Sequence, residues 1–224
     1  MSGGWLRPAV FGAMDGLVSN LALVAGVAGG TREAGDTRTV VLAGLAGLAA
    51  GAFSMAAGEY TSVASQSEAA AREIEKERSE ILRNPEGETR ELAAMYVARG
   101  VEEKLALDVA RQMHRDPENA VGVHVREELG LDADDLPSPR LAAATSFVSF
   151  AAGALVPVLP YLLGSSSLLP GLLVTLVALF VCGAVVTQVT NRSWWAGGLR
   201  QLVLGLAAAG LTYVVGAAVS ANLG

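Results

Sequence analysis

The chain has 224 residues, of which 52% are hydrophobic and 17% are charged, and its formal net charge is −6 at pH 7. An average soluble domain carries roughly 25% charged residues, so the composition excludes an ordinary soluble protein. It also argues against nucleic-acid binding, which requires a basic surface. The single cysteine, Cys182, rules out a disulfide framework.

The charged residues are segregated along the chain. Residues 66–138 contain 18 acids and 10 bases, a local net charge of −8. The remaining residues hold 4 acids and 6 bases, a net charge of +2. This division predicts three parts: a membrane part in 1–65, an acidic soluble insert in 66–138, and a second membrane part in 139–224.

Five apolar stretches reach the length of roughly 20 residues that a transmembrane helix needs. They are residues 8–30, 40–62, 140–163, 168–190 and 198–221. The first lacks a small-residue cleavage site, which favours a retained span over a signal peptide. We therefore predict an all-α membrane protein of five transmembrane helices, with the acidic domain inserted between the second and third.

The bases of the short loops predict the orientation of these spans. If the insert is cytosolic, the bases on the same side are Arg7, Arg140, Arg192 and Arg200. The opposite side then receives Arg32 and Arg38, which are offset by Glu33 and Asp36. We expect a cytosolic N-terminus and, from the Ala, Arg and Gly content, a bacterial inner membrane.

The insert is predicted to be helical throughout. No helix breaker follows the second span until Asn84-Pro85, so this helix should continue to Leu82. Shorter helices are expected over 86–98, 102–115 and 118–129, and residues 132–139 are expected to link the insert to the third span.

Asp15 is an acid inside the first span, and ionisable residues within a membrane usually indicate a functional site. The alternative is a helix cap, with the helix starting at Gly16. A helix from Gly16 to Gly30 has 15 residues and would rise only about 22 Å, too short to cross the bilayer. The spacing therefore favours a position of Asp15 inside the membrane.

A second acid, Glu59, lies at the end of a regular ridge in the second span. Gly47, Gly51, Met55 and Glu59 recur every four residues and so share one helix face. Small residues at this period allow helices to approach closely in lipid. The alternative is a packing ridge whose terminal Glu59 only reaches the cytosolic interface.

The acids of the insert recur at helical spacing. One face of the first helix carries Glu73, Glu77 and Glu80, the next helix carries Glu88 and Glu91, and the last carries His124, Glu127 and Glu128. Carboxylates with imidazole suit a first-row divalent ion better than calcium, which prefers oxygen ligands alone. The alternative is a solvated acidic face that pairs with Arg72, Lys76, Arg78, Arg83 and Arg90.

Several segments resemble the vacuolar iron transporter family over essentially the whole chain. They are FGAMDGLVSN, GAFSMAAGEYTSVASQ, EIEKERSEIL, REELGLD and ALVPVLPYLL. The resemblance implies a homodimer of five-span subunits, with a metal path between the first and second spans of both subunits. It also implies a transporter rather than an enzyme, which exports Fe²⁺ from the cytosol in exchange for protons and holds no tightly bound cofactor.

The resemblance also implies roles for individual residues. Asp15, Met55 and Glu59 resemble the pore-lining residues of the family. The glutamates that match its metal-binding domain are Glu77, Glu80, Glu88, Glu91 and Glu128. Where the family can carry two methionines before that last glutamate, this chain has His124-Val125.

Fe²⁺ would then pass from the glutamates to Glu59, Met55 and Asp15, and crowded carboxylates from two subunits would favour proton exchange. Mn²⁺, or a broader range including Zn²⁺, is an alternative cargo. A ferritin-like iron oxidase or store is a different class, but it usually requires Glu-x-x-His pairs. A structural membrane scaffold would leave Asp15 without a role.

Overall fold

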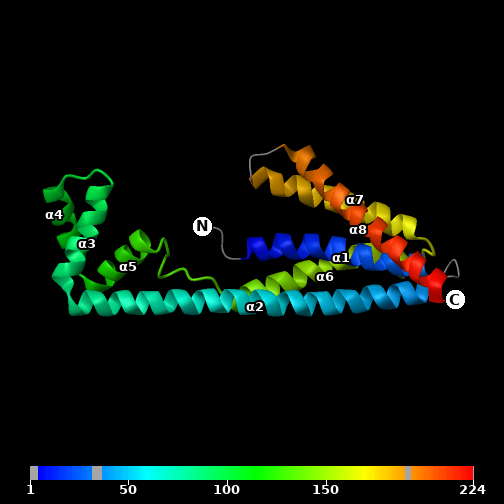
Figure 1. Ribbon diagram of the computed structural model, residues 1–224, viewed down its shortest axis with the longest axis horizontal. Helices are drawn as coiled ribbons and strands as arrows, with labels where there is room; N and C mark the ends of the chain where they lie inside the picture. The colour runs from blue at the N-terminus through cyan, green and yellow to red at the C-terminus, as the bar shows by residue number, and fades with distance from the viewer. Residues whose placement is uncertain (1–4, 32–36, 190–192, 224) are drawn as a thin grey trace. The chain divides into compact units, whose positions relative to one another are not determined.

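The computed structural model describes residues 5–31, 37–189 and 193–223, which form eight helices and no strand (Figure 1). The helices are α1 (Leu6–Gly30), α2 (Thr37–Arg83), α3 (Pro85–Ala98), α4 (Glu103–Met113), α5 (Pro117–Glu128), α6 (Pro139–Leu162), α7 (Leu168–Val189) and α8 (Trp194–Leu223). The all-helical prediction is confirmed.

Five of these helices, α1, α2, α6, α7 and α8, are long and apolar enough to cross a membrane. The prediction of five spans is therefore confirmed. Helix α2 has 47 residues and continues well beyond its apolar part, as the sequence predicted. It ends before Asn84-Pro85, where the Asn84 side chain accepts a hydrogen bond from the Gly87 amide and Pro85 begins α3.

Four of the residues used to predict the orientation, Arg32, Glu33, Asp36 and Arg192, lie outside the described residues. The other loop bases lie near the starts of helices. Arg7, Arg38 and Arg140 are the second residues of α1, α2 and α6, respectively.

The chain divides into two compact units. The span unit comprises Met1–Thr61 and Pro139–Gly224, and the helical unit comprises Ser62–Ser138. Helix α2 contributes its apolar half to the first and its charged half to the second.

Glycines allow α1 to lie directly against α6 in the span unit. A Cβ atom on Gly16 would overlap the carbonyl oxygen of Phe150, and one on Gly153 would overlap that of Ala13. Close backbone approach of this kind replaces the hydrophobic driving force that is missing between helices in lipid.

Close backbone contact at glycines also joins α1 to α8. A Cβ on Gly216 would overlap the carbonyl oxygen of Gly26, and the Thr212 hydroxyl donates a 2.6 Å hydrogen bond to the Ala22 carbonyl. Residues later in α1 contact residues later in α8, so the two helices run in the same direction. The contacts of α1 with α6 follow the same order, so these helices are also parallel. Figure 1 shows α1 beside α6 and near α8.

Helix α2 packs on α1 and α6 in the opposite direction. A Cβ on Gly47 would meet Leu23 and Asn20 of α1, and one on Gly51 would meet the ring of Phe150. Asn20 is 2% exposed, and its amide donates to the carbonyl oxygens of Gly44 at 3.2 Å and Ala154 at 2.5 Å. The predicted glycine ridge thus contacts helices of its own chain.

Replacement of Gly16 by alanine should destabilise the span unit, because the added methyl group has no room against the α6 backbone. We expect a loss of about 1–3 kcal/mol, measured as a lower unfolding midpoint in detergent. Gly210→Ala is the matched control, since its Cβ would meet nothing within 4 Å. Equal midpoints for both variants would contradict the close α1–α6 contact.

Candidate metal centre

An apolar layer holds α5 against α2 in the helical unit. Ile81 of α2 packs with Ala120, Val121 and Val125 of α5, and Ile74 packs against the same cluster. Glu77 lies three residues after Ile74 and four before Ile81, so it shares their face of α2. The apolar contacts therefore bury a carboxylate within the α2–α5 interface.

His124 of α5 meets that carboxylate. The His124 side chain is fully buried, and its Nδ1 atom lies 2.9 Å from one oxygen of Glu77 and 2.9 Å from one oxygen of Glu128. Suitable ligand atoms of these three residues all lie within 4.8 Å of one another. Two carboxylates and an imidazole at such distances can hold a first-row divalent ion.

Some polar atoms of this centre lack hydrogen-bond partners. Among the described residues they include the Nε2 atoms of His114 and His124 and one buried oxygen of Glu77. This Glu77 oxygen and one Glu128 oxygen both lie near the Nδ1 atom of His124, which can donate only one hydrogen bond. The His114 ring lies edge-on to that of His124, with centroids 5.1 Å apart, and its Nδ1 lies 2.9 Å from the Ala110 carbonyl oxygen. A buried polar atom without a partner is costly, and a cation would satisfy the Glu77 oxygen.

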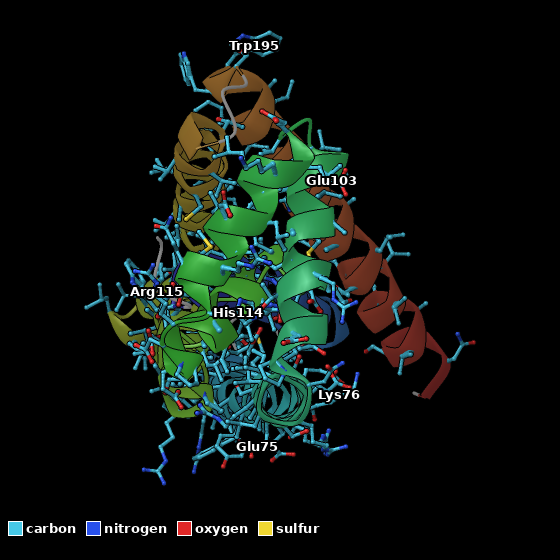
Figure 2. The ribbon with its side chains drawn as sticks, turned by 90° about the vertical axis from the view of Figure 1, so that its left-hand side faces the viewer. Glu75, Lys76, Glu103, His114, Arg115 and Trp195 are labelled. Carbon is cyan, nitrogen blue, oxygen red and sulfur yellow. The ribbon has the colours of Figure 1, made fainter. Side chains whose placement is uncertain are left out.

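The centre opens into an acidic cavity of about 280 Å³. Its lining comprises Glu73, Lys76, Glu77, Glu80, Glu88, Glu91, Glu128 and Leu129, from α2, α3 and α5 and the residue that follows α5. The structure therefore brings together six glutamates that the spacing analysis placed on three helices. Figure 2 shows His114 inside this unit and Glu75 projecting from the outer side of α2.

Some bases of this unit pair with acids outside the cavity. Arg78 contacts Glu75 and Glu118, and Arg111 contacts Asp108. Arg83 instead donates to the Ser79 hydroxyl and Arg90 to the Glu86 carbonyl, while the Lys76 ammonium lies 3.9 Å from Glu80 of the cavity lining. A solvated face neutralised by its own bases therefore describes the outer surface of α2 better than the cavity.

Glu127 neither lines the cavity nor joins the contact of His124 with Glu77 and Glu128. Its carboxylate pairs with Arg99 and lies 3.5 Å from the Tyr96 hydroxyl, on the α3 side of α5. Consecutive helix positions differ by about 100° in direction, so Glu127 and Glu128 face different neighbours. We therefore leave Glu127 out of the proposed ligand set.

The crowding of acids changes their protonation. Burial, followed by repulsion from Glu128, raises the pKa of Glu77 to about 6, although His124 opposes the shift. Burial and the neighbouring Glu91 also raise the pKa of Glu88. Both residues lie in the helical unit, outside the apolar spans. A pKa of about 6 means that Glu77 takes up a proton as the pH falls through mildly acidic values.

The structure does not bring the three predicted path residues into one cavity of the span unit. Asp15 is the tenth residue of α1, so it is not a helix cap, and it lines a cavity of about 810 Å³ beside α7 and α8. Met55 packs against the cluster of Ala52, Phe150 and Ala154, and Glu59 is half-buried on α2. Met55 and Glu59 are not among the residues that line the Asp15 cavity.

The sequence model of the VIT family matches residues 6–217. The chain belongs to this family. It is similar to the vacuolar iron transporter of Acanthamoeba castellanii, 37% identical over 218 residues, which cover 95% of this chain and 78% of that protein. Vacuolar iron transporter 1 of Oryza sativa subsp. japonica is 32% identical over 221 residues, covering 97% and 86% of the two chains.

Vacuolar iron transporter 1 of Arabidopsis thaliana is a third relative, 28% identical over 181 residues, which cover 80% of this chain and 71% of that protein. The predicted family is therefore confirmed. The VIT family comprises transporters and not enzymes, so the oxidase alternative is set aside. The chain is a multi-pass membrane protein of a metal-transport family.

Metal binding to the helical unit should weaken as the pH falls through about 6, because Glu77 must lose its proton before it can coordinate a cation. We expect affinity for Mn²⁺ to fall at least about tenfold between pH 7 and pH 5, measured by calorimetry on the detergent-solubilised chain. Glu75→Gln, at an exposed glutamate outside the cavity, should leave this pH dependence unchanged. Equal affinity at both pH values would contradict a role for Glu77.

Proposed function

We propose that this protein moves a divalent transition metal, Fe²⁺ in the first place, out of the cytosol in exchange for protons. The observation that carries the proposal is the contact of His124 with Glu77 and Glu128 at the edge of the acidic cavity. It is supported by membership of a family whose relatives are named vacuolar iron transporters.

The helical unit is proposed to collect the metal. The candidate ligands are Glu73, Glu77, Glu80, Glu88, Glu91, His124 and Glu128. Six carboxylates face a single lysine in the lining of the cavity, so a cation entering the cavity relieves repulsion between like charges. The imidazole of His124 favours transition metals over Ca²⁺ and Mg²⁺, which prefer oxygen ligands.

A cytosolic position of the helical unit, which includes the predicted domain of residues 66–138, is part of the proposal. Arg7, Arg140 and Arg200 lie within the first seven residues of α1, α6 and α8, the three helices that run in one direction. Bases concentrate on the cytosolic side of membrane proteins, so the metal-collecting side and the N-terminus are assigned to the cytosol. The bacterial inner membrane stays a prediction from composition.

The path through the membrane is proposed to lie between two copies of the chain. Phe11, Asp15, Ser19 and Leu23 follow one another at steps of four on α1, and the first and last of them are 61% and 38% exposed. A carboxylate on such a stripe needs cover inside a membrane. A second copy would supply it and could bring Asp15 near Met55 and Glu59 of its partner.

Proton exchange is proposed to follow from the carboxylates of this path. Facing acids from two subunits repel one another, which favours either a bound proton or a bound cation. Binding of metal then releases protons, and protons entering from the other side release the metal.

Mn²⁺ is a second candidate cargo, because carboxylate and imidazole ligands accept Mn²⁺ as well as Fe²⁺. Competition between the two ions in reconstituted liposomes separates the candidates. Stronger inhibition of Fe²⁺ uptake by Mn²⁺ than by equal unlabelled Fe²⁺ would assign manganese as the preferred ion.

Asp15→Ala and Glu59→Ala should each abolish Fe²⁺ flux into liposomes with an imposed pH gradient, because each removes a proposed path carboxylate. Flux should fall to the level of protein-free liposomes, while size-exclusion chromatography shows an unchanged dimer. Glu118→Gln, whose glutamate pairs with Arg78 outside the cavity, is the control and should retain flux. Normal flux in both path variants would remove these residues from the path.

Replacement of Glu77, Glu80, Glu88 and Glu91 by glutamine should abolish metal binding to the helical unit while Asp15 is intact. Titration calorimetry with Mn²⁺ should show the loss of the sites with submillimolar affinity. Glu127→Gln should bind as the unchanged chain does, because Glu127 pairs with Arg99 instead of facing the cavity. Full binding by the fourfold variant would contradict the collecting role.

A further inference from the structure

The membrane cavity that contains Asp15 also contains a base. It has a volume of about 810 Å³, and its charged lining residues are Asp15 of α1 and Arg200 of α8. Gln201 contributes a further polar side chain, and the rest of the lining is apolar. Opposite charges that share an apolar cavity inside a membrane attract strongly, because water does not screen them.

The packing of α1 on α8 explains why these two charges lie at the same level. The helices run in the same direction, and Gly26 lies against Thr212. Eleven residues before Gly26 is Asp15, and twelve residues before Thr212 is Arg200. The glycine contacts therefore fix the axial register that places carboxylate and guanidinium beside one cavity.

Arg200 differs from the other described bases of the span unit. Arg7, Arg38 and Arg140 are each the second residue of a helix, whereas Arg200 is the seventh residue of α8. Its Cα lies about 9 Å of helical rise beyond the start of the helix. An arginine one turn or more inside an apolar helix either lies beside an acid or extends its guanidinium to the membrane interface.

We propose that Arg200 is the charge-compensating residue of Asp15. The two side chains form no direct ion pair in this structure, but across the cavity that they share the guanidinium stabilises the carboxylate when no metal is bound and opposes a bound cation. The transport role rests on the proposed function, in which Asp15 belongs to the metal path. Arg200 would keep the metal-free Asp15 from being an unpaired charge in lipid, and its repulsion of a bound cation would speed release.

The pair itself is tested without transport, by a double-mutant cycle on the unfolding midpoint of the metal-free protein in detergent. The variants are Arg200→Gln, Asp15→Asn and the two combined. We expect Arg200→Gln to lower the midpoint by several degrees, and to lose at least half of this effect when it is combined with Asp15→Asn. Additive effects would overturn the proposal, since an Arg200 that only extends to the interface gives no coupling.

A matched control uses Arg140→Gln in the same cycle, because Arg140 lies near the start of α6 and outside the Asp15 cavity. Its effect on the midpoint should be the same with and without the Asp15→Asn substitution. Equal coupling of Arg140 and Arg200 to Asp15 would reduce the effect to net charge and overturn the specific pair.

The transport role is tested by measuring how Arg200 variants change the KM and, separately, the maximal rate of Fe²⁺ transport in liposomes. Arg200→Gln should lower KM roughly tenfold and also lower the maximal rate, because the cation binds more tightly and leaves more slowly. Arg200→Lys should stay within about twofold of the unchanged chain, because it keeps the positive charge beside the cavity. A purely structural role would lower the maximal rate at constant KM, and that result would overturn the proposed release step.

The two proposals fail in different ways. Normal transport by Asp15→Ala would remove Asp15 from the metal path, whereas coupling in the midpoint cycle would still support the Asp15–Arg200 pair. Loss of transport by Asp15→Ala together with additive midpoints would keep the path and overturn the pair.

Discussion

The placement of a buried imidazole between two carboxylates is the interaction on which the helical unit depends. His124 is held there by apolar contacts between α2 and α5, and these contacts also bury Glu77. Burial of a carboxylate beside other carboxylates is unfavourable without a positive partner. This cost is seen in the pKa of Glu77, which is raised to about 6 because the charged form is disfavoured. In the proposed function a divalent cation would remove this cost, and packing energy from the α2–α5 interface would then contribute to the affinity for metal.

The span unit meets the same constraint in a different solvent. Lipid cannot solvate an isolated acid, and the glycine contacts of α1 with α6 and α8 leave Asp15 on an exposed stripe beside a cavity. Asp15 then needs a proton, a metal ion or a base as its partner. Exchange among these partners is the chemistry that a proton-coupled metal transporter requires, and the proposed Arg200 pair would supply the resting state.

Much of the fold could be predicted from the sequence because local signals agree with tertiary structure. The helices expected from residues 86 and 118 begin within one residue of those positions, because Asn84 and Asp116 cap α3 and α5 and the prolines that follow, Pro85 and Pro117, lack an amide. The convergence of acids also follows from spacing, since Glu73, Glu77 and Glu80 share one helix face.

What the sequence could not predict depends on neighbours distant in the chain. Helical spacing groups Glu127 with Glu128, but Arg99 of the α3 C-cap draws Glu127 away from the cavity. The ridge of Gly47 and Gly51 indicates close contact without naming the partner, which is formed by α1 and α6 of the same chain. Arg200 was considered only as a topology signal, because its shared cavity with Asp15 depends on the α1–α8 register.

The central claim, a metal centre built on His124, is tested most directly by anomalous diffraction from crystals soaked with Mn²⁺ at pH 7.5. The account predicts a peak about 2.0–2.4 Å from ligand atoms of His124, Glu77 and Glu128, with imidazole nitrogen in the coordination sphere. Anomalous peaks confined to solvent-exposed glutamates, with His124 outside the coordination sphere, would contradict it.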